Sequence, residues 1–266
     1  MKQQDLAATF QRITCFLLDM DGTIYLGDQL LDGTLEFLDA LRATGRQAVF
    51  LTNNSSKCGA SYVEKLQRMG ITEPFLTVVT SGQATARYVL KAFPGQRPYL
   101  LGNDILKAEM LAMGVPVTND NPDYVIIAFD TQLDYEKLTH VCDYVRAGLP
   151  YIATHPDFNC PTEDGFIPDI GATIAYIKAS TGREPDLIVG KPYGTIVDDV
   201  LAQTDHKPEE MAMVGDRLYT DILTGLNHDI YSILVLTGET TQEMLDASDI
   251  RPDLVVDRLS SLIQWL

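Results

Sequence analysis

The stretch that decides the fold is CFLLDMDGTIYLGD, from Cys15 to Asp28. An apolar run, CFLL, leads directly into two aspartates, Asp19 and Asp21, which are separated by a single methionine. A short continuous apolar run that ends at a turn signal is typical of a fully buried strand. Because residues i and i+2 of an extended segment point the same way, both carboxylates are expected on one side of the chain, at the end of that strand.

Short apolar runs alternate with helical patterns along the whole chain of 266 residues. The runs that favour strands lie at 15–18, 48–51, 76–80, 98–101, 124–129, 151–154, 186–190, 211–215, 233–236 and 253–256. The segments between them that favour helices lie at 34–44, 60–69, 83–93, 134–147, 172–180 and 195–203. Strands that alternate with helices of this length predict an α/β fold built on a Rossmann-like parallel sheet.

The polar ends of the predicted strands fall into two groups, near residues 19–54 and 190–221. The middle of the chain has strands but no comparable cluster, and there are more strands than one compact sheet usually holds. Insertion of a second α/β unit explains this pattern, with Gly82 and the turn at 181–186 as junctions. We therefore expect a core domain made of 1–81 and 185–266, with an inserted α/β domain at 82–184.

Composition narrows the classes of function. The formal net charge of −17 argues against nucleic acid and against anionic membranes, since both attract basic surfaces. No apolar run approaches the ~20 residues that cross a bilayer, and the polar N-terminus lacks a signal-peptide pattern, so we expect a cytoplasmic protein. The cysteines form no C-x-x-C pair and are interpreted as free thiols.

Chemistry-bearing residues follow the predicted strands. In open α/β sheets, ligands bind outside the carboxyl ends of the strands, so these residues are expected to share one site. The residues in question, besides Asp19 and Asp21, are Thr52, Asn53, Asn54, Lys191, Asp216 and Asp221. Several carboxylates with no histidine or cysteine among them suit a hard cation such as Mg²⁺. Such a cation, together with Lys191, would create an electropositive spot that an acidic protein needs in order to bind phosphate.

Four segments, DMDGT (19–23), LTNNSS (51–56), GKP (190–192) and GDRLYTD (215–221), resemble in this order the motifs of the haloacid dehalogenase-like (HAD) phosphohydrolases. The insertion resembles the type-two α/β cap of the NagD-like, 4-nitrophenylphosphatase branch. The resemblance covers nearly the whole chain. It implies a HAD core with an inserted cap and a Mg²⁺-dependent phosphatase for small phosphomonoesters, with 4-nitrophenyl phosphate as an artificial substrate.

The resemblance also implies roles for individual residues. Asp19 is the expected nucleophile, which would form an aspartyl-phosphate, and Asp21 is the expected general acid and then base. Lys191 would balance the charge of the nucleophile and the phosphoryl group. Thr52, Asn53 and Asn54 would hold phosphate oxygens. The metal ligands would be Asp19, the main-chain carbonyl of Asp21, and Asp216, while Asp221 would orient metal-bound water.

The segment ATHPDFNCPTEDGFIPDIGAT (153–173) resembles the substrate-facing part of the cap. The branch usually has Thr-Asn-Pro-Asp and Pro-Gly there, so His155 and Asp169 depart from its pattern. Both are expected to bind substrate, and an Asp169 that faced the site would favour a cationic or hydroxylated leaving group. The alternative for Asp169 is an acid that caps the following helix. The remaining histidines show no spacing typical of metal ligands.

Other functions stay open at this stage. Phosphoryl transfer to an acceptor other than water is one, and a non-catalytic HAD protein that binds a phosphorylated metabolite is another. Asp21 argues against a dehalogenase, since dehalogenases of the superfamily lack this second acid. A P-loop kinase is excluded because Pro185 stands where the first glycine is required. The physiological substrate and the choice between monomer and homodimer do not follow from the sequence.

Overall fold

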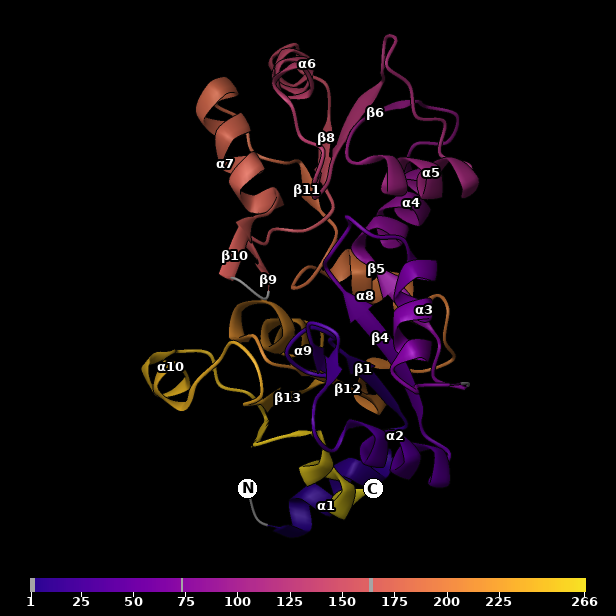
Figure 1. Ribbon diagram of the computed structural model, residues 1–266, viewed down its shortest axis with the longest axis vertical. Helices are drawn as coiled ribbons and strands as arrows, with labels where there is room; N and C mark the ends of the chain where they lie inside the picture. Colours follow the sequence, from indigo (N-terminus) through magenta and orange to yellow (C-terminus); the bar gives the residue numbers. More distant parts are fainter. Residues whose placement is uncertain (1–2, 73, 163–164) are drawn as a thin grey trace. The chain divides into compact units, whose positions relative to one another are not determined.

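The computed structural model describes residues 3–72, 74–162 and 165–266 (Figure 1). The chain divides into two compact units, one made of 1–51, 62–79 and 200–266, and the other of 52–61 and 80–199. Each unit contains a parallel sheet, as the predicted α/β class requires. Within the described residues, no helix has both the length and the apolar character that a membrane span needs.

The elements are as follows. The α-helices are α1 (Gln3–Arg12), α2 (Thr34–Ala43), α3 (Gly59–Arg68), α4 (Ser81–Ala92), α5 (Asp104–Ala112), α6 (Tyr135–Arg146), α7 (Ile170–Thr181), α8 (Gly194–Leu201), α9 (Leu223–Asn227) and α10 (Gln242–Ala247). The strands are β1 (Cys15–Leu18), β2 (Tyr25–Leu26), β3 (Gln29–Leu30), β4 (Gln47–Thr52), β5 (Val78–Thr80), β6 (Pro98–Leu101), β7 (Tyr124–Ile127), β8 (Tyr151–Ala153), β9 (Asn159–Thr162), β10 (Gly165–Pro168), β11 (Leu187–Ile188), β12 (Met211–Gly215), β13 (Tyr231–Val235) and β14 (Leu254–Val256). Short 3₁₀ segments lie at Pro208–Glu210 and Leu259–Trp265, and a π-helical turn lies at Leu218–Ile222.

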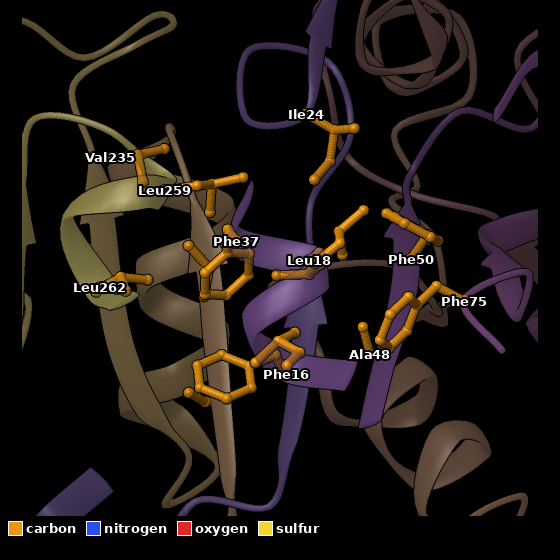
Figure 2. Close-up of a cluster of buried hydrophobic side chains, with 14 of the residues drawn as sticks. Phe16, Leu18, Ile24, Phe37, Ala48, Phe50, Phe75, Val235, Leu259 and Leu262 are labelled. Carbon is orange, nitrogen blue, oxygen red and sulfur yellow. The ribbon is translucent and has the colours of Figure 1, made fainter. Parts of the chain in front are cut away.

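The sheet of the first unit has six strands in the order β14-β13-β12-β1-β4-β5. β1 pairs in parallel with both β12 and β4, which makes the CFLL run an interior strand. All four of its residues are buried, as expected for a sheet covered on both faces. Figure 2 shows Phe16 and Leu18 of β1 among the aromatic and aliphatic side chains of this core. The rings of Phe16 and Phe37 pack edge to face, with their centroids 5.6 Å apart.

The second unit has a four-stranded parallel sheet in the order β11-β8-β7-β6. Its apolar core includes residues of α6 and α7, and Figure 1 shows these helices on one side of the sheet and α4 and α5 on the other. An antiparallel hairpin of β9 and β10 also belongs to this unit. The run at 186–190 was predicted to be a strand of the core sheet. This prediction was wrong, because β11 (Leu187–Ile188) pairs with β8 of the second sheet.

The predicted fold class, a parallel-sheet core with an inserted α/β cap, is confirmed. The boundaries of the cap at 82 and 184 stay a prediction. Helix ends follow local signals: Asp134, predicted as the first residue of a helix, is instead the N-cap of α6, where its Oδ1 accepts a hydrogen bond from Lys137 N at 2.8 Å. Helix α1 and the two hairpins were not predicted, because their segments are short or polar.

Candidate active site

The end of β1 presents the two aspartates of the DMDGT segment. Asp19 N donates to Val214 O at 2.9 Å, which extends the pairing of β1 with β12 by one residue. Met20 is fully buried, whereas Asp19 and Asp21 on either side of it are partly exposed. The alternation expected from the sequence is therefore present, and the sheet delivers both carboxylates at its carboxyl edge.

A tight turn follows the second aspartate. Gly22 adopts a positive φ of 90°, and the amides of Thr23, Ile24 and Tyr25 all point to Met20 O. The hydroxyl of the buried Tyr25 donates a long hydrogen bond to Asp21 Oδ2, at 3.4 Å. The turn thus places the Tyr25 hydroxyl beside the carboxylate of Asp21, the residue expected to act as general acid and base.

Asp216 follows β12 and is almost inaccessible to solvent, at 2% exposure. Its Oδ2 accepts a hydrogen bond from Glu239 N at 2.6 Å, while its Oδ1 is buried and has no hydrogen-bond partner among the described residues. Burial above all, and then the neighbouring Asp221 carboxylate, raise the pKa of Asp216 from 3.8 to about 7. A Cβ on Gly22 would lie 2.4 Å from Asp216 Oδ2, so glycine is needed there for space as well as for its φ.

Asp221 lies in the π-helical turn Leu218–Ile222, which opens directly after β12. Its side chain is fully buried and its Oδ2 accepts a hydrogen bond from Arg217 N at 3.1 Å. A Cβ on Gly215 would meet Asp221 Cγ at 2.3 Å, so the last residue of β12 must be small. The wider helical turn, a form often found at functional sites, brings this carboxylate back to the strand end.

Asp19, Asp216 and Asp221 each offer a carboxylate oxygen, and these oxygens all lie within 4.8 Å of one another. Carboxylates this close together, two of them buried, repel one another strongly unless a proton or a cation lies between them. The orphaned Asp216 Oδ1 and the all-oxygen donor set fit a hard divalent cation such as Mg²⁺. The carboxylate of Asp21 is not part of this cluster, and the role of its main-chain oxygen as a metal ligand stays a prediction.

The predicted phosphate-binding segment begins at the end of β4 and belongs to the second compact unit. Thr52 Oγ1 accepts a hydrogen bond from Asn54 N at 3.1 Å. Asn54 Oδ1 accepts from Ser56 N and Ser56 Oγ at 2.9 and 2.8 Å, which forms a closed turn. Asn54 is partly exposed and Thr52 is buried, so the role of both in substrate binding stays a prediction.

Asn53 and Lys191 are brought together although 138 positions separate them in the chain. Asn53 Oδ1 accepts from Lys191 N at 2.8 Å, and Asn53 Nδ2 donates to Lys191 O at 3.0 Å. Asn53 Nδ2 also lies 3.1 Å from Asp157 Oδ1. The sequence did not single out Asp157, which stands in the quoted cap segment without a recognisable motif of its own.

His155 and Asp169, the two departures in the cap, are buried against each other. His155 Nε2 lies 3.1 Å from Asp169 Oδ1, and His155 Nδ1 lies 3.0 Å from Thr154 Oγ1. Asp169 also caps α7 by accepting from Ile170 N at 2.6 Å, as the alternative interpretation expected. Both side chains therefore have hydrogen-bond partners within the second unit, and their role toward a substrate stays a prediction.

A parallel α/β sheet that presents a carboxylate cluster at its carboxyl edge is an arrangement suited to binding a hard cation together with a phosphate group. The family model described as haloacid dehalogenase-like hydrolase matches residues 16–116, and the model described as HAD-hydrolase-like matches residues 188–262. The chain belongs to the haloacid dehalogenase-like hydrolases, in the NagD/4-nitrophenylphosphatase branch, and is a HAD-type phosphatase. Members of this family typically use Mg²⁺, which the acidic cluster fits.

Similarity to known proteins extends over nearly the whole chain. The structure of a 4-nitrophenylphosphatase from Thermotoga maritima is 49% identical and superposes with a TM-score of 0.93 over 96% of this chain and 98% of that one. A structure described as a putative NagD protein is 47% identical, with a TM-score of 0.90 over 95% of this chain and 98% of that one. An acid sugar phosphatase of Staphylococcus saprophyticus is 36% identical over 252 residues, which is 94% of this chain and 97% of the relative.

Proposed function

We propose that the protein is a Mg²⁺-dependent phosphatase that hydrolyses small phosphomonoesters through an aspartyl-phosphate on Asp19. The observation that carries the proposal is the carboxylate cluster of Asp19, Asp216 and Asp221, in which the buried Asp216 Oδ1 has no hydrogen-bond partner within the part of the chain that the structure describes. The names of the relatives suggest a substrate class: one is an acid sugar phosphatase and another a 4-nitrophenylphosphatase. We therefore propose sugar phosphates as the first class to test and 4-nitrophenyl phosphate as an artificial substrate.

In the proposed reaction, an oxygen of Asp19 attacks phosphorus and displaces the alcohol, and water later hydrolyses the acyl phosphate. Asp21 protonates the leaving oxygen and then removes a proton from the attacking water. The hydrogen bond from Tyr25 Oη to Asp21 Oδ2, at 3.4 Å, favours one orientation of the Asp21 carboxylate. Thr52, Asn54 and the main-chain amides near Asn53 are proposed to bind phosphate, and Lys191 is proposed to balance the negative charge of the transferred group.

Asp19, Asp216 and the main-chain carbonyl of Asp21 are the residues proposed to hold Mg²⁺, with Asp221 beside them. When bound, Mg²⁺ supplies positive charge that offsets the carboxylates and the phosphate dianion. His155 and Asp169 are proposed to shape the substrate side of the cap. The substrate itself is proposed to be a small phosphorylated metabolite. The protein is proposed to be a monomer or a homodimer.

The test measures phosphate release from a panel of sugar phosphates, other phosphomonoesters and 4-nitrophenyl phosphate, with Mg²⁺ and with EDTA. The native protein is compared with Asp19→Asn, which keeps the size of the side chain and removes the nucleophile. Asp205→Asn, at an exposed position, is the matched control. We expect release only with Mg²⁺, a fall of at least about 10⁴-fold in kcat for Asp19→Asn, and native rates for the control.

Two outcomes would move the conclusion to other functions. Phosphate that appears on added glycerol rather than free in solution would indicate a phosphotransferase. Absence of release from every ester, together with tight binding of one of them, would indicate a phosphometabolite-binding protein. Native rates in Asp19→Asn would contradict the assignment of the nucleophile.

A further inference from the structure

The Asn53 side chain is committed to other groups of the protein. Its Oδ1 accepts from Lys191 N, and its Nδ2 donates to Lys191 O and toward the Asp157 carboxylate. A carboxamide has two N–H donors, and Lys191 O and Asp157 together account for both. The side chain is 5% exposed. A carboxamide with this set of partners has no donor left for a phosphate oxygen.

We propose that Asn53 is a positioning residue that clamps the main chain of Lys191, and not a substrate-binding side chain. The paired contacts to Lys191 N and Lys191 O, at 2.8 and 3.0 Å, reproduce the donor and acceptor pattern by which one strand residue holds another. Two hydrogen bonds to one residue restrain both its position and its rotation. The clamp therefore fixes the stem from which the Lys191 ammonium extends. The proposal rests on the proposed function in so far as Lys191 serves catalysis.

The clamp is held from both sides. Asn53 O accepts a short hydrogen bond from Ser81 Oγ, and that hydroxyl lies 3.4 Å from His155 Nδ1. Asp157, whose carboxylate accepts the hydrogen bond from Asn53 Nδ2, is only 7% exposed and lies two residues after His155. The Asn53 carboxamide is thus held by the Lys191 main chain and by Asp157, and its carbonyl is held by Ser81, so several hydrogen bonds fix the clamp.

Packing at Gly190 shows that the clamp requires close contact. A Cβ on Gly190 would lie 2.6 Å from Asn53 Oδ1, 2.7 Å from His155 Cβ and 2.8 Å from Thr154 O. Only a glycine lets the chain before Lys191 approach the carboxamide to hydrogen-bonding distance. The glycine of the GKP segment is therefore explained by the clamp and needs no phosphate contact of its own.

The decisive experiment is a double-mutant cycle between Asn53→Ala and Lys191→Ala, with kcat and KM measured on 4-nitrophenyl phosphate. A residue that acts only by placing Lys191 loses its effect once the ammonium is gone. We expect Asn53→Ala alone to lower kcat about 10²-fold with little change in KM. In the Lys191→Ala background the same change should alter kcat less than about 3-fold. Equal losses in both backgrounds would show that Asn53 acts independently of the Lys191 ammonium and would overturn the proposal.

A second measurement does not depend on activity. Hydrogen exchange of the Lys191 amide reports on its bond to Asn53 Oδ1, and we expect Asn53→Ala to accelerate it at least about 10-fold. Unchanged exchange at Lys191 would overturn the clamp. This readout separates failure of the clamp from failure of the proposed function, since a protein that hydrolyses no ester still reports it.

Further variants test whether the effect of Asn53→Ala comes from loss of the clamp or only from unfolding of the chain. Asn53→Asp keeps the acceptor for Lys191 N but sets a carboxylate against Asp157 and Lys191 O. Adding Asp157→Asn to that variant restores a donor between the two side chains, so we expect kcat to recover at least about 5-fold. No recovery would count against the clamp. Asn119→Ala, at an exposed asparagine of the same unit, should leave kcat and the Lys191 exchange rate at native values.

Discussion

Replacing Asp216 by Asn should stabilise the protein when metal is absent and weaken its response to Mg²⁺. The carboxylate is 2% exposed, faces Asp221 and leaves Oδ1 without a partner among the described residues. Asparagine has the same shape and carries no charge, so it avoids the cost of burying a second anion. The oxygen of the carboxamide can still accept the hydrogen bond from Glu239 N.

The magnitude follows from the raised pKa. A pKa raised from 3.8 to about 7 corresponds to about 4 kcal/mol of penalty on the ionised form. Asp221 shares this penalty, and the neutral amide forms a weaker hydrogen bond with Glu239 N, so we expect a net gain of roughly 1–3 kcal/mol at pH 8. For a chain of this size that is a rise in Tm of roughly 2–4 °C for each kcal/mol.

The sign of the pH dependence is fixed by the direction of the shift. The protonated carboxyl contributes stability that is fully present below pH 3.8 and is lost as the pH rises through about 7. The native protein in EDTA should therefore lose stability, relative to Asp216→Asn, between about pH 4 and pH 7. At pH 5 most of the difference between the two should disappear.

The assay is thermal unfolding in EDTA and in Mg²⁺, at pH 5 and pH 8, with Asp205→Asn as an exposed control. Mg²⁺ at 100 times its dissociation constant should stabilise the native protein by about 2.7 kcal/mol and the variant by much less. The reasoning is refuted if Asp216→Asn is no more stable than the native protein in EDTA at pH 8. It is also refuted if Mg²⁺ raises the Tm of both proteins equally.

Two other changes test the packing. Gly22→Ala places a Cβ 2.4 Å from Asp216 Oδ2 at a φ of 90°, so we expect Mg²⁺ affinity, measured by calorimetry, to fall at least about 10-fold. Gly45→Ala has a similar φ of 69° with open space around its Cβ, and it should lose stability but keep native affinity. Arg46→Ala should lower the free energy of unfolding in urea by about 2–3 kcal/mol, and a loss below ~0.5 kcal/mol would contradict this estimate. The Arg46 guanidinium donates to the main-chain oxygens of Phe10, Ile13 and Leu266 at 3.0, 3.0 and 2.7 Å.

Local sequence was enough to predict what depends on neighbouring residues. The burial of β1, the outward alternation of Asp19 and Asp21 around Met20, and the glycine turn at Gly22 all follow from strand geometry and turn chemistry. The four motifs identified the family because their residue types and order are shared by its members. The cap was predicted from what its segment lacks, namely acidic strand ends.

Tertiary structure alone decided which distant residues meet. The sequence placed the strand before Lys191 in the core sheet, and only the pairing of Leu187–Ile188 with β8 assigns it to the second sheet. The carboxylate of Asp221, predicted to orient metal-bound water, lies within the acidic cluster because a π-helical turn returns it to β12. Asn53 was predicted to bind substrate, and no local pattern shows that its side chain is held by Lys191 and Asp157. The physical reason is that strand and turn propensities act over a few residues, whereas strand partners and buried hydrogen bonds are chosen by packing across the whole chain.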